Sequence, residues 1–302
     1  MPVPLLLDTD IGSDVDDALA LALAIRHPGI DLRTVTTVSA DTTARAHIAA
    51  RLLAIAGHDG VEVAAGVRVP GDEQNWSGRE GEGLAPGAEV SLSERGGVDA
   101  LCDVERDTVV ATIGMQSNLA AAVERDPSLV ERIDRLVVMG GTFAPIVLLD
   151  GTEFDAARDW NLVVDPAGAV LSLNAGFPTL YVPCDVTFRL PLRQRHLDRL
   201  RQGDELCQVL GRMIDDWRAQ VLAQYDEAKL GDVVALLHDP LAVACVVEQS
   251  FVTIERLPVH VVIQDAVPHT IVDPDVGLEA DVVRSVDAPA FADWWLETVL
   301  GR

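Results

Sequence analysis

The sequence has 302 residues, 49% of them hydrophobic, and a formal net charge of -25 from 23 basic and 48 acidic side chains. This length and apolar content suffice for a sizeable core, in one large α/β domain or two small ones. A surface this acidic repels phosphate backbones and anionic membrane surfaces, so we expect neither nucleic acid nor a membrane as partner.

Cysteine usage and the N-terminal stretch bear on the cellular compartment. The four cysteines, Cys102, Cys184, Cys207 and Cys245, are far apart and form no Cys-x-x-Cys pair. A thiolate zinc site is therefore not indicated, and disulfides are not required. The N-terminus has no basic region, Asp8 interrupts its apolar stretch, and no apolar run approaches the roughly 20 residues that span a bilayer. We therefore expect a cytoplasmic protein.

The first part of the chain predicts alternating strands and helices. Residues 3–7 form a short apolar run bounded by prolines and acids, which is typical of a buried strand. Residues 16–27 and 43–56 are rich in Ala and Leu and favour helices, whereas 32–38 and 61–65 favour strands. This β-α-β-α-β alternation predicts a parallel sheet.

The middle of the chain continues the alternation, with two irregular interruptions. Strands are predicted at 108–113, 135–139 and 179–182, and helices from Leu119 and over 166–173. Residues 66–97 are rich in Gly, Pro and acids and have little periodicity. We interpret them as a mobile flap, with a solvated linker as the alternative. Residues 142–158 are also predicted to be irregular.

From residue 193 onward helical patterns dominate. Helices are predicted over 193–201, 206–222 and 288–300, and another follows His238-Asp239-Pro240 as far as residue 247. Segments 252–254 and 259–263 predict late, antiparallel strands. No repeat or domain linker is visible, so we expect a single domain over 1–302. Its predicted fold class is α/β: an open, mostly parallel sheet flanked by helices, with a Rossmann-like core and a more helical C-terminal part.

Five carboxylates crowd the turn between the first strand and the first helix. They are Asp8, Asp10, Asp14, Asp16 and Asp17. In an open α/β sheet ligands bind at such turns, and like charges this close recruit a cation or stay protonated. Ligands that offer only oxygen favour Ca²⁺ or Mg²⁺. The alternative is that the last three acids are solvated in the first helical turn. We favour the metal because the acids flank a buried strand.

The acidic turn is the first of several landmarks. Asp8-Thr9-Asp10, Gly12 and Asp16-Asp17-Ala18 are followed by segments 36–38, 114–118, 137–141, 159–161 with 165–166, and 238–240. In sequence and order they resemble the inosine-uridine nucleoside hydrolase family. The resemblance implies hydrolysis of the N-glycosidic bond of ribonucleosides with inversion, and one Ca²⁺ in the active site. It further implies a small-molecule nucleoside as the partner and a homo-oligomer, a dimer or a tetramer.

The resemblance also implies roles for individual acids around the metal. Ca²⁺ would be bound by Asp10, Asp17, Asp239 and the backbone carbonyl of Ser117, and Asp8 would orient these ligands. Asp10 would also accept a proton from a Ca²⁺-bound water, since a bound cation lowers the pKa of water. Carboxylates around the sugar favour the positive charge that develops as the bond breaks.

A second group of residues is implied to hold the ribose. Asp16, Asp159 and Asn161 would bind its hydroxyls, and Asp41 lies where an Asn that contacts ribose is common in the family. This chain has two extra residues between Gly12 and the Asp16-Asp17 pair, so Asp14 is an alternative to Asp16. Such departures leave the preferred nucleobase open.

The departing base needs a proton or hydrogen bonds. His238, next to an implied metal ligand, is the candidate general acid. The alternative is a histidine that makes a structural hydrogen bond at a helix N-terminus. Trp160 is predicted to form a wall of the pocket. Tyr225 either stacks on the base or packs within a helical pattern.

Two other functions are compatible with the residues. Asp8-Thr9-Asp10 also resembles an aspartyl-phosphate nucleophile motif, which would indicate a Mg²⁺-dependent phosphohydrolase. That function needs a phosphate-binding lysine, and the one lysine of the chain, Lys229, is remote from every strand-end motif. The third possibility is a protein that binds a nucleoside or sugar with Ca²⁺ but does not cleave it.

Overall fold

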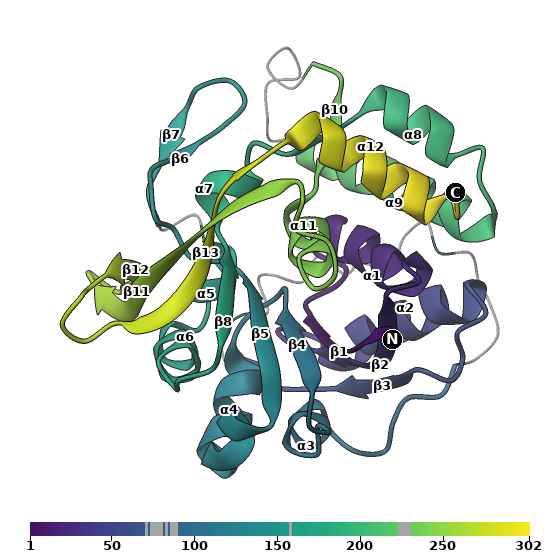
Figure 1. Cartoon of the computed structure of the whole chain (residues 1–302). Coiled ribbons are helices and arrows are strands. Elements are labelled where there is room, and N and C mark those ends of the chain that lie inside the picture. Colours follow the sequence, from purple (N-terminus) through teal and green to yellow (C-terminus); the bar gives the residue numbers. More distant parts are fainter. Residues whose placement is uncertain (70–71, 73–80, 82–83, 85–89, 157–158, 223–230) are drawn as a thin grey trace.

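The computed structural model describes residues 1–302 apart from 70–71, 73–80, 82–83, 85–89, 157–158 and 223–230. Within the described residues, a nine-stranded sheet forms the centre of the molecule (Figure 1). Its strands are β1 (Val3–Thr9), β2 (Ile30–Thr37), β3 (Glu62–Ala65), β4 (Thr108–Thr112), β5 (Ile133–Met139), β8 (Thr179–Val182), β11 (Val252–Gln264), β12 (Val267–Val272) and β13 (Leu278–Val286).

The order of the strands is β12-β11-β13-β8-β5-β4-β1-β2-β3. From β3 to β13 every neighbouring pair is parallel, and β11 and β12 extend one edge in the antiparallel sense. The predicted open, mostly parallel α/β sheet is therefore confirmed. In a parallel sheet of this kind the carboxyl ends of the strands face the same edge, so the turns after β1, β4 and β5 come together.

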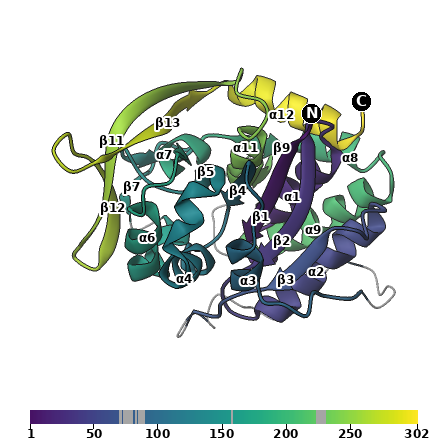
Figure 2. The same cartoon turned by 60° about the horizontal axis from the view of Figure 1, so that its bottom comes forward.

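Helices cover both faces of the sheet (Figures 1 and 2). One face packs against α1 (Asp16–Arg26), α2 (Thr42–Ile55), α8 (Gln194–Leu200), α9 (Glu205–Leu222), α11 (His238–Ala244) and α12 (Ala288–Val299). The other packs against α3 (Gly97–Cys102), α4 (Ser117–Arg125) and α6 (Pro166–Leu173). Leu5 and Leu7 belong to the first core and Leu6 to the second, because successive strand residues point to opposite faces. Of the described helices, none combines the length and the hydropathy needed to cross a membrane.

Smaller elements connect the layers. They are α5 (Trp160–Val163), α7 (Cys184–Thr187), the 3₁₀ helix η2 (Pro127–Glu131), the antiparallel pair β6 (Ile146–Val147) and β7 (Glu153–Phe154), and the pair β9 (Pro191–Arg193) and β10 (Val233–Leu236). Residues 142–158, predicted to be irregular, thus contain a short hairpin. Most of the predicted flap over 66–97 lies outside the described residues.

The C-terminal strands differ most from the prediction. Segments 252–254 and 259–263 are not two strands but parts of one, β11, which is antiparallel to both β12 and β13. β13 escaped prediction because acidic and basic side chains interrupt its apolar residues, as expected for a strand that is partly exposed. β13 nevertheless pairs in parallel with β8 and so continues the central sheet.

Candidate active site

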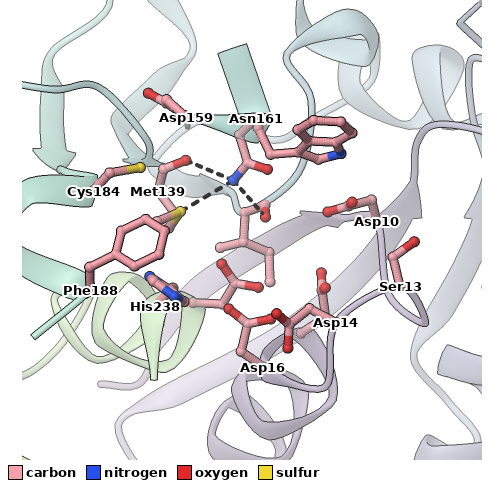
Figure 3. A pocket seen from close by; sticks show the side chains of 14 residues that line it. Asp10, Ser13, Asp14, Asp16, Met139, Asp159, Asn161, Cys184, Phe188 and His238 are labelled. Carbon is pink, nitrogen blue, oxygen red and sulfur yellow. Dashed lines mark hydrogen bonds between the residues drawn. The ribbon is translucent and has the colours of Figure 1, made fainter. Parts of the chain in front are cut away.

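A cavity of about 260 Å³ lies where the turns after β1, β4 and β5 meet the first turns of α1 and α11 (Figure 3). Six carboxylates line it: Asp10, Asp14, Asp16, Asp17, Asp159 and Asp239. The position agrees with the general preference of open α/β sheets to bind ligands outside the carboxyl ends of their strands. Residues from both ends of the chain therefore share one small space.

Three of these carboxylates form the tightest group, which we call the acid trio: Asp16, Asp17 and Asp239. Asp16 and Asp17 begin α1, and Asp239 lies in the first turn of α11. One carboxylate oxygen from each lies within 4.8 Å of the others, and all three residues are buried. The N-terminal end of a helix carries a positive partial charge, which favours acids in these first turns.

Negative charge on the acid trio is unfavourable as long as no cation lies beside it. Burial raises the pKa of Asp16, Asp17 and Asp239 well above the ordinary value, and repulsion from neighbouring carboxylates raises it further. A cation between the three oxygens would remove this repulsion and favour the ionised form. The donors are all oxygen, which suits a hard divalent ion and not a thiophilic one. The trio therefore fits a metal ion.

Asp10 reaches the cavity from the turn after β1 and is not part of the acid trio. A Cβ atom at Gly114 would lie 2.8 Å from both the backbone N and Oδ1 of Asp10. Only glycine therefore allows the turn after β4 to approach Asp10 this closely. Burial raises the pKa of Asp10, and the nearby Arg45 guanidinium opposes that effect.

Asp8 is fully buried at the end of β1 and is not one of the residues that line the cavity. Its Oδ1 accepts hydrogen bonds from Thr36 Oγ1 at 2.6 Å and from Asn118 Nδ2 at 2.7 Å. Its Oδ2 has no hydrogen-bond partner among the described residues. Burial raises the pKa of Asp8 to about 7, although both hydrogen bonds lower it.

The residues predicted to hold the sugar come from the start of α5. Asp159 Oδ2 accepts a hydrogen bond of 2.6 Å from the backbone N–H of Gly141, and burial raises the pKa of Asp159 to about 7. Asn161 Nδ2 donates to the carbonyl oxygens of Ile113 at 3.1 Å and Met139 at 3.0 Å, as the dashed lines in Figure 3 show. These two bonds fix the amide and leave its Oδ1 as an acceptor for a ligand.

His238 and two aromatic residues form a less polar wall. His238 Nδ1 lies 2.7 Å from Thr187 Oγ1, and its ring meets Phe188 edge-on with a centroid distance of 4.7 Å. Burial lowers the pKa of His238 to about 4, so the ring is neutral at pH 7. Trp160 lines the same cavity and is 49% exposed. Phe188 escaped prediction because its sequence neighbourhood resembles that of any core phenylalanine.

Of the remaining predicted residues, Asp41 and Ser117 are not among the lining residues of this cavity. Asp41 caps α2 by accepting the backbone N–H of Ala44 at 3.1 Å, and it pairs with Arg68 at 2.8 Å. Its contact with ribose stays a prediction. Ser117 begins α4, is not a lining residue, and donates its hydroxyl to Asp165 at 2.5 Å. Tyr225 lies outside the described residues.

Asp14, the alternative to Asp16, also lines the cavity. Its Oδ1 accepts the backbone N–H of Val15 at 2.5 Å, and burial raises its pKa to about 6. The structure thus brings both acids to the cavity but groups Asp16 with the other two members of the trio. Ser13 and Cys184 line the cavity as well, although no sequence pattern singled them out.

Comparison with known proteins adds a family to this geometry. A family model described as inosine-uridine preferring nucleoside hydrolase matches residues 5–293. The chain belongs to this family. Its members hydrolyse the N-glycosidic bond of ribonucleosides, so the protein is a nucleoside hydrolase, an N-glycosyl hydrolase that acts on small molecules. The resemblance drawn from the landmarks is confirmed, and the phosphohydrolase alternative is not supported.

Individual relatives extend over most of the chain. The pyrimidine-specific ribonucleoside hydrolase RihA of Escherichia coli O81 is 27% identical over 275 residues, covering 85% of this chain and 83% of the relative. The protein of the same description in Klebsiella pneumoniae is 28% identical over 273 residues, with the same coverage.

Solved structures share the fold. A plant nucleoside hydrolase superposes with a TM-score of 0.81 at 20% identity and covers 100% of both chains. A purine-preferring ribonucleoside hydrolase from Gardnerella vaginalis gives 0.78 at 24% identity, covering 99% of this chain and 98% of that one. The sheet and its helices are therefore those of a nucleoside hydrolase along the whole length.

Proposed function

We propose that this nucleoside hydrolase is calcium-dependent, acts as one domain over residues 1–302, and cleaves ribonucleosides to ribose and free base with an aspartate-activated water. The observation that carries the proposal is the acid trio: three buried carboxylates converge beside a cavity and repel one another. A divalent cation is the simplest partner for such a group. Family membership supplies the reaction.

We infer that Asp10, Asp17 and Asp239 hold the ion, with the backbone carbonyl of Ser117 as a further ligand. Calcium accepts six to eight oxygen ligands in flexible geometry, whereas magnesium demands a near-ideal octahedron. Carboxylates from a loop and from two helix ends suit the flexible ion better. When bound, calcium supplies positive charge that acidifies the attacking water and helps to orient the ribose hydroxyls.

The protein's own side chains perform the remaining tasks. Besides holding the ion, Asp10 accepts the proton of the attacking water, since its carboxylate lines the cavity. Asp16, Asp159 and the Oδ1 of Asn161 accept hydrogen bonds from the ribose hydroxyls. As the bond to the base breaks, the sugar becomes cationic, and the surrounding carboxylates stabilise it more than the neutral substrate.

The base leaves along the wall that carries His238. His238 Nδ1 lies 2.7 Å from Thr187 Oγ1, and we assign the hydroxyl as the donor; in that tautomer the neutral ring bears its proton on Nε2 and donates it in a hydrogen bond to the departing base. Because burial lowers the pKa of His238 to about 4, the ring acts as a hydrogen-bond donor and is not a stored imidazolium. Phe188 and Trp160 provide apolar surface for the base.

Release of free ribose from a panel of purine and pyrimidine nucleosides tests this function. The panel needs both classes because the relatives include a pyrimidine-specific and a purine-preferring enzyme. We expect turnover with calcium and its loss in EGTA. Asp239→Asn should abolish calcium activation, whereas Asp59→Asn, at an exposed position, should behave as the wild type. If no nucleoside of the panel released ribose in the presence of calcium, the proposal would be contradicted. The molar mass from light scattering tests the homo-oligomer that the resemblance implies.

A further inference from the structure

Arg45 is a fully buried arginine in α2. Arginine remains charged under all ordinary conditions, and burial of a charge is costly unless the surroundings supply hydrogen bonds and opposite charge. The sequence around Arg45 is the Ala-rich pattern of an ordinary helix, so nothing there indicates a special role. Its surroundings in the structure do.

The Arg45 guanidinium joins two turns that follow neighbouring strands. Its Nη1 donates to the carbonyl oxygens of Asp10 and Ile11, the latter at 2.9 Å, and its Nη2 donates to Ser13 Oγ at 2.8 Å. Its Nε donates to the carbonyl oxygen of Ser39 at 3.0 Å. One side chain thus connects the turn after β1, which carries Asp10, to the turn after β2.

Both turns contain residues with positive φ, and in the second turn these residues are not glycines. Gly12 has φ 119°, and Ser39 and Ala40 have φ 73° and 48°. The left-handed conformation is unfavourable for residues that carry a Cβ atom. Two such residues in succession keep it only when their surroundings hold them there. The Ala40 N–H donates to Asp72 Oδ2 at 2.8 Å, and Arg45 holds the Ser39 carbonyl. The second turn is therefore a firm anchor for the guanidinium.

The charge of Arg45 also faces the site. It opposes the effect of burial on both Asp10 and Asp17, lowering the pKa of each carboxyl. It does so without entering the cavity, since Arg45 is not a lining residue. The positive charge and the donors thus act on the site through the loop that carries Asp10.

We propose that Arg45 is a positioning residue: by bridging the 10–13 and 39–40 turns, it fixes the Asp10 backbone so that the Asp10 carboxylate meets the acid trio. The proposal rests on the proposed function for its consequence, metal binding, but not for the bridge itself. The bridge needs the planar, forked guanidinium, because its three nitrogens reach four acceptors on two turns, whereas an ammonium group has three N–H donors on a single nitrogen.

Two variants separate the fork from the charge. Arg45→Lys keeps the positive charge and removes the fork, and Arg45→Gln removes both. Leu52→Ala is the matched control, since Leu52 is buried in the same helix and belongs to the hydrophobic core. It lowers the melting temperature by removing core packing and should leave the loop after β1 unchanged.

Each variant is tested for calcium binding by isothermal titration, for kcat and KM, and for deuterium exchange of residues 10–17 without metal. We expect both Arg45 variants to bind calcium about 10- to 100-fold more weakly, as for lost support of metal ligands. At saturating calcium kcat should fall while KM stays within about threefold, because Arg45 contacts no substrate. Exchange over 10–17 should rise in both variants and not in Leu52→Ala.

The outcomes separate the two proposals. Wild-type calcium affinity and exchange in Arg45→Gln would overturn the role of Arg45 while leaving the proposed function intact. Full recovery in Arg45→Lys would also overturn it, because charge alone would then suffice. If the wild type binds no calcium, the proposed function fails, and the exchange measurement still decides whether Arg45 holds the loop.

Discussion

Asn118 donates a hydrogen bond of 2.7 Å to Asp8, and both side chains are fully buried. The same amide nitrogen donates to the carbonyl oxygen of Thr37 at 3.0 Å, and its Oδ1 accepts the backbone N–H of Val67 at 2.7 Å. Asn118 therefore joins the ends of β1 and β2 to the start of α4. It holds Asp8, and through Asp8 the turn that carries Asp10.

Replacing Asn118 with alanine should destabilise the protein and weaken the site together. The change removes three hydrogen bonds, each worth about 1 kcal/mol: Asp8 keeps its bond from Thr36 and the Thr37 carbonyl keeps that from Gly66, whereas the Val67 N–H loses the acceptor Asn118 Oδ1. We expect the free energy of unfolding to fall by at least about 3 kcal/mol, measured by urea denaturation with and without calcium. Asn174→Ala is the control, since Asn174 makes two similar backbone bonds to Val261 and does not line the cavity. Equal losses of activity in both variants would argue against a specific role.

Gly114→Ala should damage the site with little change elsewhere. The new Cβ atom would lie 2.8 Å from the backbone N and Oδ1 of Asp10, so either Asp10 or the turn after β4 must move. We expect calcium affinity to fall about tenfold or more, as for other disturbed metal ligands. Gly60→Ala is the control, because a Cβ there meets no atom within 4 Å. Calcium titration of the two variants gives the comparison, and equal affinities would refute the expectation.

Stability should depend on pH in a way that calcium reverses. Burial raises the pKa of Asp8 and Asp159 from 3.8 to about 7 in the folded protein. The folded state therefore binds more protons than the unfolded state, and this contribution to stability is fully present below the unfolded pKa and lost as pH rises through about 7. Metal binding competes with these protons, so calcium should stabilise more at about pH 8 than at about pH 5.

Melting temperatures at both pH values, with calcium or EGTA, measure this effect. Asp8→Asn removes one of the two carboxyls and keeps its shape, so it should flatten the pH dependence seen in EGTA. A metal-free protein that is more stable at about pH 8 than at about pH 5 would contradict the assignment, since the sign of the slope follows from the raised pKa values.

His238→Ala should lower kcat by about 10²-fold, the lower end of the range for acid–base help, because a neutral ring offers a hydrogen bond only. Burial lowers the pKa of His238 to about 4, so the pH profile of kcat should show no limb from this residue between about pH 5 and 8. The control is His58→Ala, at an exposed position. A wild-type profile with a histidine limb near neutral pH that disappears in His238→Ala would show that the ring stores a proton.

Local sequence patterns predicted the core of the sheet and much of the cavity. The strand-to-helix turn at residues 8–17 was recognisable because acids crowded next to a buried apolar run are rarely part of a solvated surface. Asp159 was located through the resemblance to the nucleoside hydrolase family, and His238 because it is the neighbour of the metal ligand that this resemblance implies. The acidic turn thus needed only local residue types, whereas the other two residues needed the resemblance.

Other features depend mostly on contacts that no local pattern encodes. Asp41 was expected at the sugar, yet an aspartate is also a preferred N-cap, and the start of α2 uses it in that way. Arg45 has the sequence context of a surface arginine, but the turn after β1, more than 30 residues earlier in the chain, packs against its guanidinium. Phe188 lines the cavity only because α7 brings it against His238. Tertiary packing decided the positions of Arg45 and Phe188, whereas the cap at Asp41 is a local contact.

The acid trio also sets a condition on biosynthesis. A nascent chain that has emerged as far as β8 holds the consecutive parallel strands of the sheet together with Asp16 and Asp17, but Asp239 is still to be translated. On the proposed mechanism such a chain has two members of the acid trio but lacks Asp239, a ligand of the ion. Nucleoside cleavage therefore begins only after α11 has been synthesised. Chains that end before α11 are expected to be inactive on nucleosides.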